Sequence, residues 1–348
     1  MFRVFDGKTA DEVWRKAAYA FQRGDGADQS SRSGATRELL HSAMSISDPT
    51  QRWVTSRVPT INPAFAIAET IWLITGRNDS AFLNYFNRQL PNYAGHSSTY
   101  HGAYGHRLRY HFGIDQLERA YQALSSKPDT RQVTLQIWDA RIDLPGPKGE
   151  EVSPDIPCNV GAILKVRSGK LEWMQILRSN DLYLGLPYNI VQFTTLQEVL
   201  AGWLGIQLGE YNQISNSLHV YVRDLTRIKQ VLFSDCCADD LNIDSLALPK
   251  RESERSFADL SGNIESIIDE GVSAATLIRN VRRATSAPAF RNMLCVLSAE
   301  GSRRRGSLDI AREIMAECTN PCYGLLFDRW LLRAAENPDR QGSLMTQD

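Results

Sequence analysis

The sequence contains no long hydrophobic run. No apolar stretch approaches the roughly 20 residues that a helix needs to span a bilayer, and residues 1–15 lack the apolar core of a signal peptide. Neither a membrane-spanning segment nor a secretory leader is expected. We therefore predict a cytoplasmic protein that does not engage a membrane.

The chain also lacks an excess of positive charge. Lysine and arginine together number 39, against 40 for aspartate and glutamate. Proteins that hold nucleic acid through its phosphates carry clustered basic side chains, because counterion release supplies much of the affinity. This charge balance makes nucleic acid a poor candidate as a partner.

Cysteine is sparse for a chain of 348 residues. The six cysteines stand unevenly at 158, 236, 237, 295, 318 and 322, unlike the dense framework of a small disulfide-bonded domain. We expect reduced thiols, one of which could be a nucleophile. A metal site is disfavoured, because no tight cysteine pair accompanies Cys318 and Cys322 and because the histidines at 96, 101, 106 and 111 are spaced by five and do not keep one helical face.

The composition, 43% hydrophobic and 23% charged, allows one large core or two modest domains. Residues 10–22 and 62–76 carry apolar side chains at helical spacing, and the second segment begins with Asn-Pro and ends in Gly, as a capped helix does. Residues 24–34 are rich in Gly, Ser, Asp and Arg without apolar periodicity. We interpret them as a mobile loop of the kind that closes on anions.

The middle of the chain is predicted to be rich in strands. Strand-like patterns cover 132–138, 160–167, 171–178 and 206–222, and a helical pattern covers 191–204. Helical patches follow at 258–269, 274–284, 308–317 and 324–335. We therefore divide the chain into a catalytic domain over 1–235 and a helical extension over 236–348.

The stretch with the most chemical information runs from Asp-Ile-Pro-Cys158-Asn to Arg178-Ser-Asn-Asp-Leu-Tyr-Leu-Gly-Leu-Pro-Tyr-Asn189. An arginine grips phosphate with a bidentate fork and lowers the pKa of a nearby thiol. An asparagine amide can pair with O4 and N3–H of uracil. Considered singly, Cys158 would be a small buried apolar side chain and Asn189 a helix N-cap.

The order of these motifs over residues 30–225 resembles the thymidylate synthase family, together with the related pyrimidine nucleotide hydroxymethylases. The resemblance implies an α+β fold, in which a mixed, bent β-sheet is flanked by helices and pairs with a second copy in a homodimer. It implies that Cys158 adds to C6 of the pyrimidine and that Asn189 reads the base. Arg178 and Ser179 match phosphate ligands of the family.

Three further motifs extend the binding site that the resemblance implies. Arg32-Ser-Gly stands in the place of the family's Arg-Thr-Gly, which makes Arg32 a phosphate ligand. Pro-Asp-Thr-Arg131 is similar to Pro-Asp-Ser-Arg, whose arginine crosses to the phosphate bound by the other subunit. His219-Val-Tyr221 resembles the His-x-Tyr pair that holds the sugar 3′-hydroxyl.

The resemblance also implies catalytic and folate-binding residues. Glu69-Thr-Ile-Trp72 is similar to the helix whose glutamate organises water and proton transfers, with Trp72 on the cofactor side, and Tyr104 matches the tyrosine that helps to remove the C5 proton. Asp181 matches the contact to the pterin of methylene-tetrahydrofolate, and Gly185 lets cofactor and base approach. Glu69 has independent support, because a carboxylate inside an apolar helix needs a partner or a function.

The sequence departs from the family where the product is decided. Gln132 replaces a phosphate arginine, Asn159 a histidine and Asn180 a cysteine, and Leu-Pro-Asn-Tyr at 90–93 replaces the tryptophans that shield folate. The apolar C-terminal tail that closes the site is replaced by the helical extension. These departures leave addition and condensation intact but bear on hydride transfer, because exclusion of water decides the product.

We expect transfer of a one-carbon unit to C5 of a pyrimidine nucleoside monophosphate, with dUMP as the first candidate. Whether a methyl or a hydroxymethyl group results is left open, and so are the choice between uracil and cytosine and the choice between ribose and deoxyribose. An inactive nucleotide-binding paralogue is the remaining alternative. The presence of Glu69, Tyr104 and Cys158 together argues against it, since a binding protein needs none of the three.

Overall fold

The computed structural model describes residues 2–231 and 240–336. Eight strands form one mixed sheet in the order β1-β3-β8-β6-β5-β4, with β2 paired to β3 and β7 paired to β8. The pairs β1–β3, β6–β8 and β7–β8 are parallel and the others antiparallel. The strands are β1 (Arg3–Gly7), β2 (Ala27–Ser31), β3 (Gly34–Ile46), β4 (Thr134–Gln136), β5 (Asn159–Arg167), β6 (Lys170–Leu177), β7 (Asn180–Asp181) and β8 (Gln207–Tyr221).

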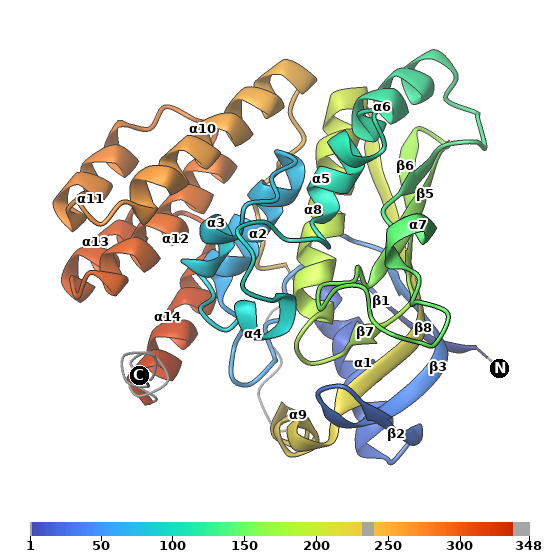
Figure 1. Ribbon diagram of the computed structural model, residues 1–348. Helices are drawn as coiled ribbons and strands as arrows, with labels where there is room; N and C mark the ends of the chain where they lie inside the picture. The colour runs from blue at the N-terminus through green and yellow to red at the C-terminus, as the bar shows by residue number, and fades with distance from the viewer. Residues whose placement is uncertain (1, 232–239, 337–348) are drawn as a thin grey trace.

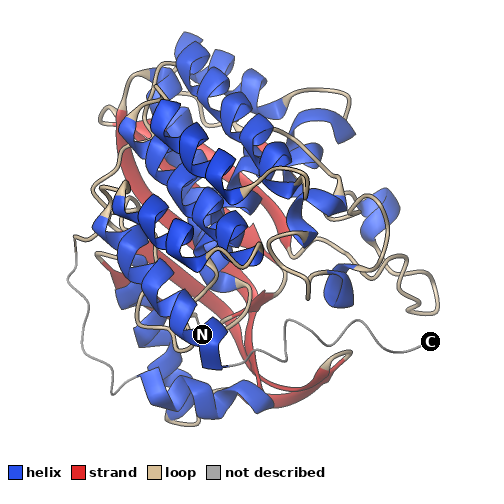
Figure 2. Cartoon of the chain, turned by 90° about the vertical axis from the view of Figure 1, so that its left-hand side faces the viewer, coloured by secondary structure: helices blue, strands red, loops and turns tan. Residues whose placement is uncertain are grey.

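Helices interrupt and follow the strands of this sheet along the chain, and Figure 2 shows them in front of its long strands. The longest helix within the strand-rich part, α8, is almost wholly buried. The helices are α1 (Ala10–Gln22), α2 (Pro63–Ile74), α3 (Ser80–Asn84), α4 (Pro91–Ala94), α5 (Tyr104–His106), η1 (Arg107–His111), α6 (Gln116–Ser126), α7 (Ala140–Asp143), α8 (Leu186–Leu204), η2 (Val222–Asp224), α9 (Leu225–Val231), α10 (Lys250–Ile268), α11 (Ala274–Arg283), α12 (Pro288–Arg304), α13 (Leu308–Ala316) and α14 (Pro321–Glu336). The predicted α+β class, a mixed sheet flanked by helices, is confirmed.

The two longest strands change the face that they bury at the same level of the sheet. In β3 the buried positions run through Leu39 and then resume at Ser42, and in β8 they run to Ser215 and resume at Leu218. His41 lies at the change in β3 and has a φ of 55°. Since the pairing of the two strands keeps one register on both sides of this point, they bend together.

Several predicted elements are present with shifted ends. The predicted helices at 10–22 and 62–76 are α1 and α2, and the predicted hairpin is β5 and β6. The expectation of a loop throughout 24–34 was wrong, because β2 pairs with β3. All five side chains of β2 are exposed, which explains the lack of an apolar pattern there.

The C-terminal helices pack on the strand-rich part of the chain. Helices α10, α12 and α14 contact α2, and α10 also contacts α8, as Figure 1 shows for the orange and red helices beside α2. Helix α12 was not predicted, since most of its residues are buried and no amphipathic pattern marks it. The boundary near residue 235, with Cys236 and Cys237, lies outside the described residues.

No helix in the described part of the chain combines the length and the apolar character that crossing a membrane requires.

Candidate active site

A cavity of about 2090 Å³ lies where the sheet meets α2, α8 and the C-terminal helices. This volume exceeds the roughly 300–1,000 Å³ of a pocket for one small ligand, so two ligands can lie in it side by side. The residues from the sequence analysis that line it are Arg32, Glu69, Trp72, Tyr104, Cys158, Arg178, Ser179, Asp181, Gly185, Asn189, His219 and Tyr221. Arg131 is exposed on the surface and does not line the cavity.

The thiol of Cys158 stands directly before β5, and Arg178, which follows β6, is fastened beside it. The Arg178 amide donates to the Cys158 carbonyl at 2.9 Å. The Arg178 guanidinium donates to the carbonyls of Pro157 at 2.8 Å and Ile156 at 3.1 Å, and it lies over the Trp138 ring at 5.4 Å. The antiparallel pairing of β5 and β6 therefore brings the expected nucleophile and the expected phosphate ligand together.

Burial raises the pKa of the Cys158 thiol, and the nearby Asp155 and Asp181 raise it further, whereas the Arg178 guanidinium opposes the shift. Burial also raises the pKa of Asp155 to about 6, against the hydrogen bond that its carboxylate accepts from the Gly102 amide at 2.7 Å. The free site thus holds its thiol in the neutral form at neutral pH. An activated thiolate requires that a ligand change this balance of charges.

Two acidic groups face the same cavity from α2 and α5. Burial raises the pKa of Glu69 to about 8, with a hydrogen bond from Gln192 opposing the shift. One carboxyl oxygen of Glu69 is buried without a hydrogen-bond partner. Burial and the neighbouring Cys158 raise the pKa of Tyr104, whose ring stacks on Phe193 at 6.0 Å. An orphaned carboxyl oxygen at a cavity wall marks a place for a polar ligand or water.

Asn189 lies in a row of buried polar side chains. Its oxygen accepts from the Asn159 amide at 3.5 Å, and its nitrogen donates to the Asn180 oxygen at 3.3 Å. The row continues from Asn159 to Gln175 at 2.9 Å and from Asn180 to Ser215 at 3.1 Å. If the Asn189 amide were turned by 180°, its nitrogen would meet the Asn159 nitrogen and its oxygen would meet the Asn180 oxygen. The two hydrogen bonds therefore fix the orientation of this amide.

The amide of Asn189 keeps one N–H and one lone pair beyond those used in the row. These match O4 and N3–H of a uracil ring. The alternative interpretation of Asn189 as an N-cap was wrong, because α8 begins at Leu186, with Gly185 as its N-cap. Sequence analysis identified Asn159 and Asn180 only as departures from the family, although their polar side chains at strand positions could have indicated a buried network.

Asp181 and His219 are cross-strand partners in β7 and β8. One carboxylate oxygen of Asp181 accepts from the amides of Tyr183 at 2.7 Å and Leu184 at 2.8 Å, which holds the turn into α8. Burial raises the pKa of Asp181. The other oxygen is not used by this turn and is available to a ligand in the cavity.

Trp72 and Gly185 contribute shape rather than charge to the cavity. The indole N–H of Trp72 donates to the Asp79 carbonyl at 3.0 Å, and its ring meets Tyr100 edge to face at 6.5 Å. A Cβ on Gly185 would make only ordinary contacts, the nearest at 3.7 Å. The protein itself therefore leaves room above Gly185, as a ligand that approaches the backbone requires.

Arg32 lies in the turn between β2 and β3 and reaches the loop that precedes Cys158. Its guanidinium contacts the Glu151 carboxylate at 2.9 Å and donates to the Pro154 carbonyl at 3.1 Å. Ser179 lies between Arg178 and β7 and lines the same cavity. The three expected phosphate ligands within one chain, Arg32, Arg178 and Ser179, thus line one cavity.

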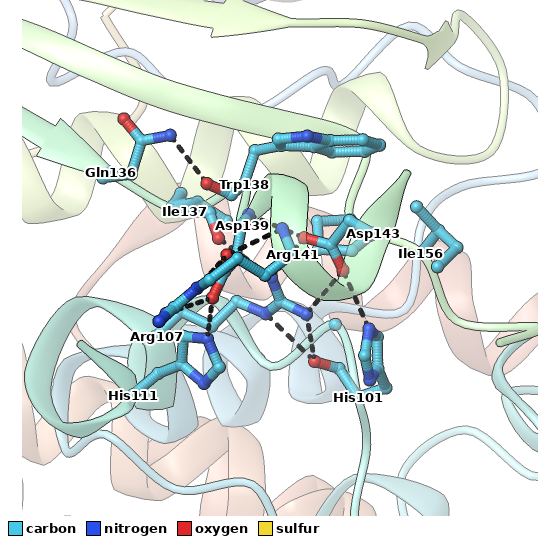
Figure 3. A network of polar contacts seen from close by, with 12 residues as sticks. His101, Arg107, His111, Gln136, Ile137, Trp138, Asp139, Arg141, Asp143 and Ile156 are labelled. Atoms are coloured by element: carbon cyan, nitrogen blue, oxygen red, sulfur yellow. Dashed lines mark hydrogen bonds and ion pairs between the residues drawn. The ribbon is translucent and has the colours of Figure 1, made fainter. Parts of the chain in front are cut away.

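A second polar network fixes the segment that carries Tyr104 (Figure 3). Buried Arg107 contacts Asp143 at 2.9 Å and donates to the His101 carbonyl at 3.0 Å, while the His101 ring contacts Asp143 at 2.8 Å. The His111 ring contacts Asp139 at 2.8 Å. Both histidines therefore pair with carboxylates.

The cysteines and histidines considered for a metal site gather no ligand set in the part of the chain that the structure describes. Over residues 2–231 and 240–336, no group of three or more His, Cys, Asp or Glu side chains is placed to hold a metal ion.

The C-terminal helices supply a cationic part of the cavity wall that sequence analysis missed. The residues concerned on α12 and α14 are Arg303, Arg304, Trp330 and Arg333. Arg303 and Arg304 each contact the buried Glu300 at 2.7 Å, and this carboxylate also accepts from the Trp330 indole at 3.0 Å. The run Arg303-Arg304-Arg305 was a visible signal in the sequence.

The chain is similar to known proteins of one family. The sequence profile of the family described as Thymidylate synthase matches residues 22–258. The chain is 33% identical over 199 residues to the deoxyuridylate hydroxymethyltransferase of Bacillus phage SP01, covering 54% of this chain and 51% of that protein. It is 38% identical over 169 residues to the protein of the same name from Pseudomonas phage M6, covering 48% and 47%.

An archaeal relative is also similar. The chain is 33% identical over 129 residues to a putative thymidylate synthase of Methanothermobacter marburgensis, covering 37% of this chain and 55% of that protein. The chain thus spans about half the length of these curated relatives.

Proposed function

The chain belongs to the thymidylate synthase family, and on this premise we propose that it transfers a one-carbon unit from methylene-tetrahydrofolate to C5 of a uracil nucleoside monophosphate, with dUMP as the reference substrate. One observation carries the proposal: the thiol of Cys158, the orphaned carboxyl of Glu69 and the oriented amide of Asn189 line one cavity. A protein that only binds a nucleotide needs no thiol and no orphaned carboxyl.

The nucleotide is held at both ends. Arg32, Arg178 and Ser179 bind the phosphate, and the amide of Asn189 pairs with the base. We also propose that Arg131 reaches the phosphate bound by a second copy in a homodimer, because it is exposed outside its own cavity. His219 and Tyr221, whose rings meet edge to face at 5.8 Å, face the sugar.

Cys158 then adds to the ring. Its sulfur forms a bond to C6 and pushes the ring electrons toward O4, where the N–H of Asn189 stabilises the developing negative charge. Arg178 favours the thiolate that this step needs. Glu69, with its pKa raised to about 8, is protonated at neutral pH and exchanges protons with the ring through water, and Tyr104 assists removal of the C5 proton.

Methylene-tetrahydrofolate supplies the carbon atom that is transferred. Asp181, with one carboxylate oxygen outside the turn, and Trp72 would hold the pterin, while Gly185 leaves space for it. The cavity is large enough to hold the nucleotide and the folate together.

A hydroxymethyl product is the second candidate. Arg303, Arg304 and Arg333 form a polar, cationic part of the cavity wall on α12 and α14, and this wall favours water in the site. Two of the relatives are named deoxyuridylate hydroxymethyltransferases. Once C5 has bonded to the transferred carbon, loss of the C5 proton expels the folate and leaves an exocyclic methylene on the ring. Water added to this carbon gives a hydroxymethyl group, whereas hydride from the folate gives a methyl group, and in both cases the bond between Cys158 and C6 breaks to release the product.

Mass spectrometry of the nucleotide after incubation with methylene-tetrahydrofolate tests the reaction. The expected result is a C5-modified product from dUMP with the wild-type protein and none with Cys158→Ser. Absorbance of dihydrofolate separates the products, because only methylation oxidises the folate. Absence of a modified product from dUMP, UMP, dCMP and CMP alike contradicts the proposal.

A further inference from the structure

Glu38 is a carboxylate in the cavity wall that the proposed chemistry does not use. It lies on β3, where it is partly buried, and it lines the cavity together with His219 and Tyr221. Within the described residues it takes part in no ion pair. Its neighbour Arg37 pairs instead with Asp28 at 2.9 Å.

The register of the sheet places Glu38 directly beside His219. The two are opposite each other in the antiparallel pair β3–β8, so their side chains share one face with Cβ atoms about 4.5–5.5 Å apart. On the other side of β8, His219 is paired with Asp181 of β7. The sugar-binding position thus lies between two carboxylates, of which Asp181 is assigned to the pterin.

One half of the Glu38 carboxylate is fixed and the other half is available. The hydroxyl of Ser217, two residues before His219 on the same strand, donates to one carboxylate oxygen. The second oxygen has no donor within the described residues, and it is not among their buried polar atoms that lack a partner. It is therefore accessible from the cavity that Glu38 lines. The fixed half orients an acceptor toward the cavity.

The available oxygen selects ligands that donate hydrogen bonds. A carboxylate repels phosphate, and the contacts of the proposed phosphate ligands do not include Glu38, since Arg32 pairs with Glu151 and Arg178 donates to the carbonyls of Pro157 and Ile156. Sugar hydroxyls are donors, and carboxylates that bind ribose hydroxyls recur in dinucleotide-binding folds. A ribose whose 3′-hydroxyl meets His219 and Tyr221 carries its 2′-hydroxyl on the adjacent carbon atom. This hydroxyl is then within reach of Glu38, the side chain opposite His219.

We propose that Glu38 determines the sugar specificity of this site by accepting a hydrogen bond from the 2′-hydroxyl of a ribonucleotide, so that UMP binds more tightly than dUMP. The inference rests on the proposed function for the placement of base and phosphate. With this contact, the substrates of the site include ribonucleotides as well as deoxyribonucleotides.

Calorimetric binding of UMP and dUMP to the full-length protein tests this role without requiring turnover. A hydrogen bond to a charged acceptor predicts a preference for UMP of about tenfold in Kd. Glu38→Leu removes the acceptor and brings the ratio of the two Kd values close to one, chiefly by weakening UMP. Glu38→Gln keeps an oxygen but loses the charge, so an intermediate ratio is expected, and this variant replaces Glu38→Leu if the latter does not fold.

Asp28→Asn is the matched control, because this carboxylate lies on the same hairpin but does not line the cavity. It should leave the ratio unchanged. Equal affinities of the wild type for UMP and dUMP, or an unchanged ratio in both Glu38 variants, overturn the inference even if dUMP is modified at C5. Conversely, a UMP preference that Glu38→Leu removes sustains the inference even if no nucleotide is turned over.

Discussion

The side-chain nitrogen of Asn189 donates to the side-chain oxygen of Asn180 at 3.3 Å, in a place where both residues are buried. Asn180 in turn donates to Ser215 at 3.1 Å, so its own amide cannot turn without losing two hydrogen bonds. The strand β7 thereby determines which edge of the Asn189 amide a base meets.

Asn180→Leu should weaken recognition of uracil through the orientation of the Asn189 amide. The Asn189 amide loses the acceptor that orients it, and we expect kcat/KM for dUMP to fall by about 10- to 100-fold, since an unpaired buried donor costs about 1–3 kcal/mol. The preference for dUMP over dCMP should narrow as well. A fall in kcat/KM with unchanged base preference would indicate a merely structural role, and Ser215→Ala, one step further along the row, serves as the milder control.

Asn189→Asp should shift the base preference toward cytosine. An amide offers a donor to O4 and an acceptor to N3–H, whereas a protonated carboxyl can donate to the unprotonated N3 of cytosine. We expect kcat/KM for dUMP to fall by about 100-fold or more and the dCMP-to-dUMP ratio to rise. Competition between the two nucleotides in one reaction measures this ratio directly, and an unchanged ratio contradicts the assigned role of Asn189.

Alkylation of Cys158 by iodoacetamide should depend steeply on pH. Because burial raises the pKa of this thiol, its thiolate fraction is still increasing above pH 9, and the alkylation rate should rise without a plateau between pH 7 and 9. Arg178→Gln removes the opposing charge and should slow alkylation, by about tenfold for each unit of pKa. Peptide mapping by mass spectrometry assigns the modified cysteine, and a plateau below pH 8 would contradict the expected shift.

Glu69 should make the stability of the protein depend on pH. Its pKa in the folded state is about 8, above the ordinary value of 4.5, so its stabilising contribution is fully present below about pH 4.5 and is lost as the pH rises through 8. Relative to wild type, Glu69→Gln should therefore gain up to about 3 kcal/mol between pH 5.5 and 8.5. Urea unfolding of both proteins at the two pH values measures the difference, and parallel pH profiles would contradict it.

Mixed dimers test the role of Arg131. If its guanidinium completes the phosphate site of the other subunit, Arg131→Ala and Cys158→Ser should each be nearly inactive, the first by about 100-fold through loss of a charged contact to phosphate. Mixing the two under conditions that exchange subunits should restore part of the activity, because one site of each mixed dimer keeps both residues. Failure to restore activity in verified mixed dimers argues against a shared site.

Sequence patterns predicted the elements whose apolar spacing is regular. The helices α1 and α2 and the hairpin β5–β6 were predicted on this ground, and part of the cavity lining, including Cys158 and Asn189, followed from the resemblance. Patterns did not predict β2, whose side chains are all exposed, or α12, which is buried on nearly all sides. Neither element shows the contrast between two faces on which such predictions depend.

The part of the site that the sequence did not indicate is made of long-range contacts. The orientation of Asn189 depends on Asn159 and Asn180, which lie 30 and 9 residues away along the chain. The acceptor role of Glu38 depends on the register between β3 and β8. The arginine-rich wall depends on the packing of α12 and α14 on α2.

The contact between Arg32 and Glu151 means that one of the proposed phosphate ligands is already paired with a carboxylate before a nucleotide arrives. Binding is then an exchange of anions, in which a phosphate displaces a carboxylate that belongs to the protein. Removal of that internal competitor, as in Glu151→Gln, should tighten nucleotide binding, while the hydrogen bond from Arg32 to the Pro154 carbonyl still holds the hairpin of β2 and β3 to the loop before Cys158. The ion pair of Arg32 and Glu151 therefore lowers the affinity for substrate while it supplies one of the two contacts that hold this hairpin to the loop.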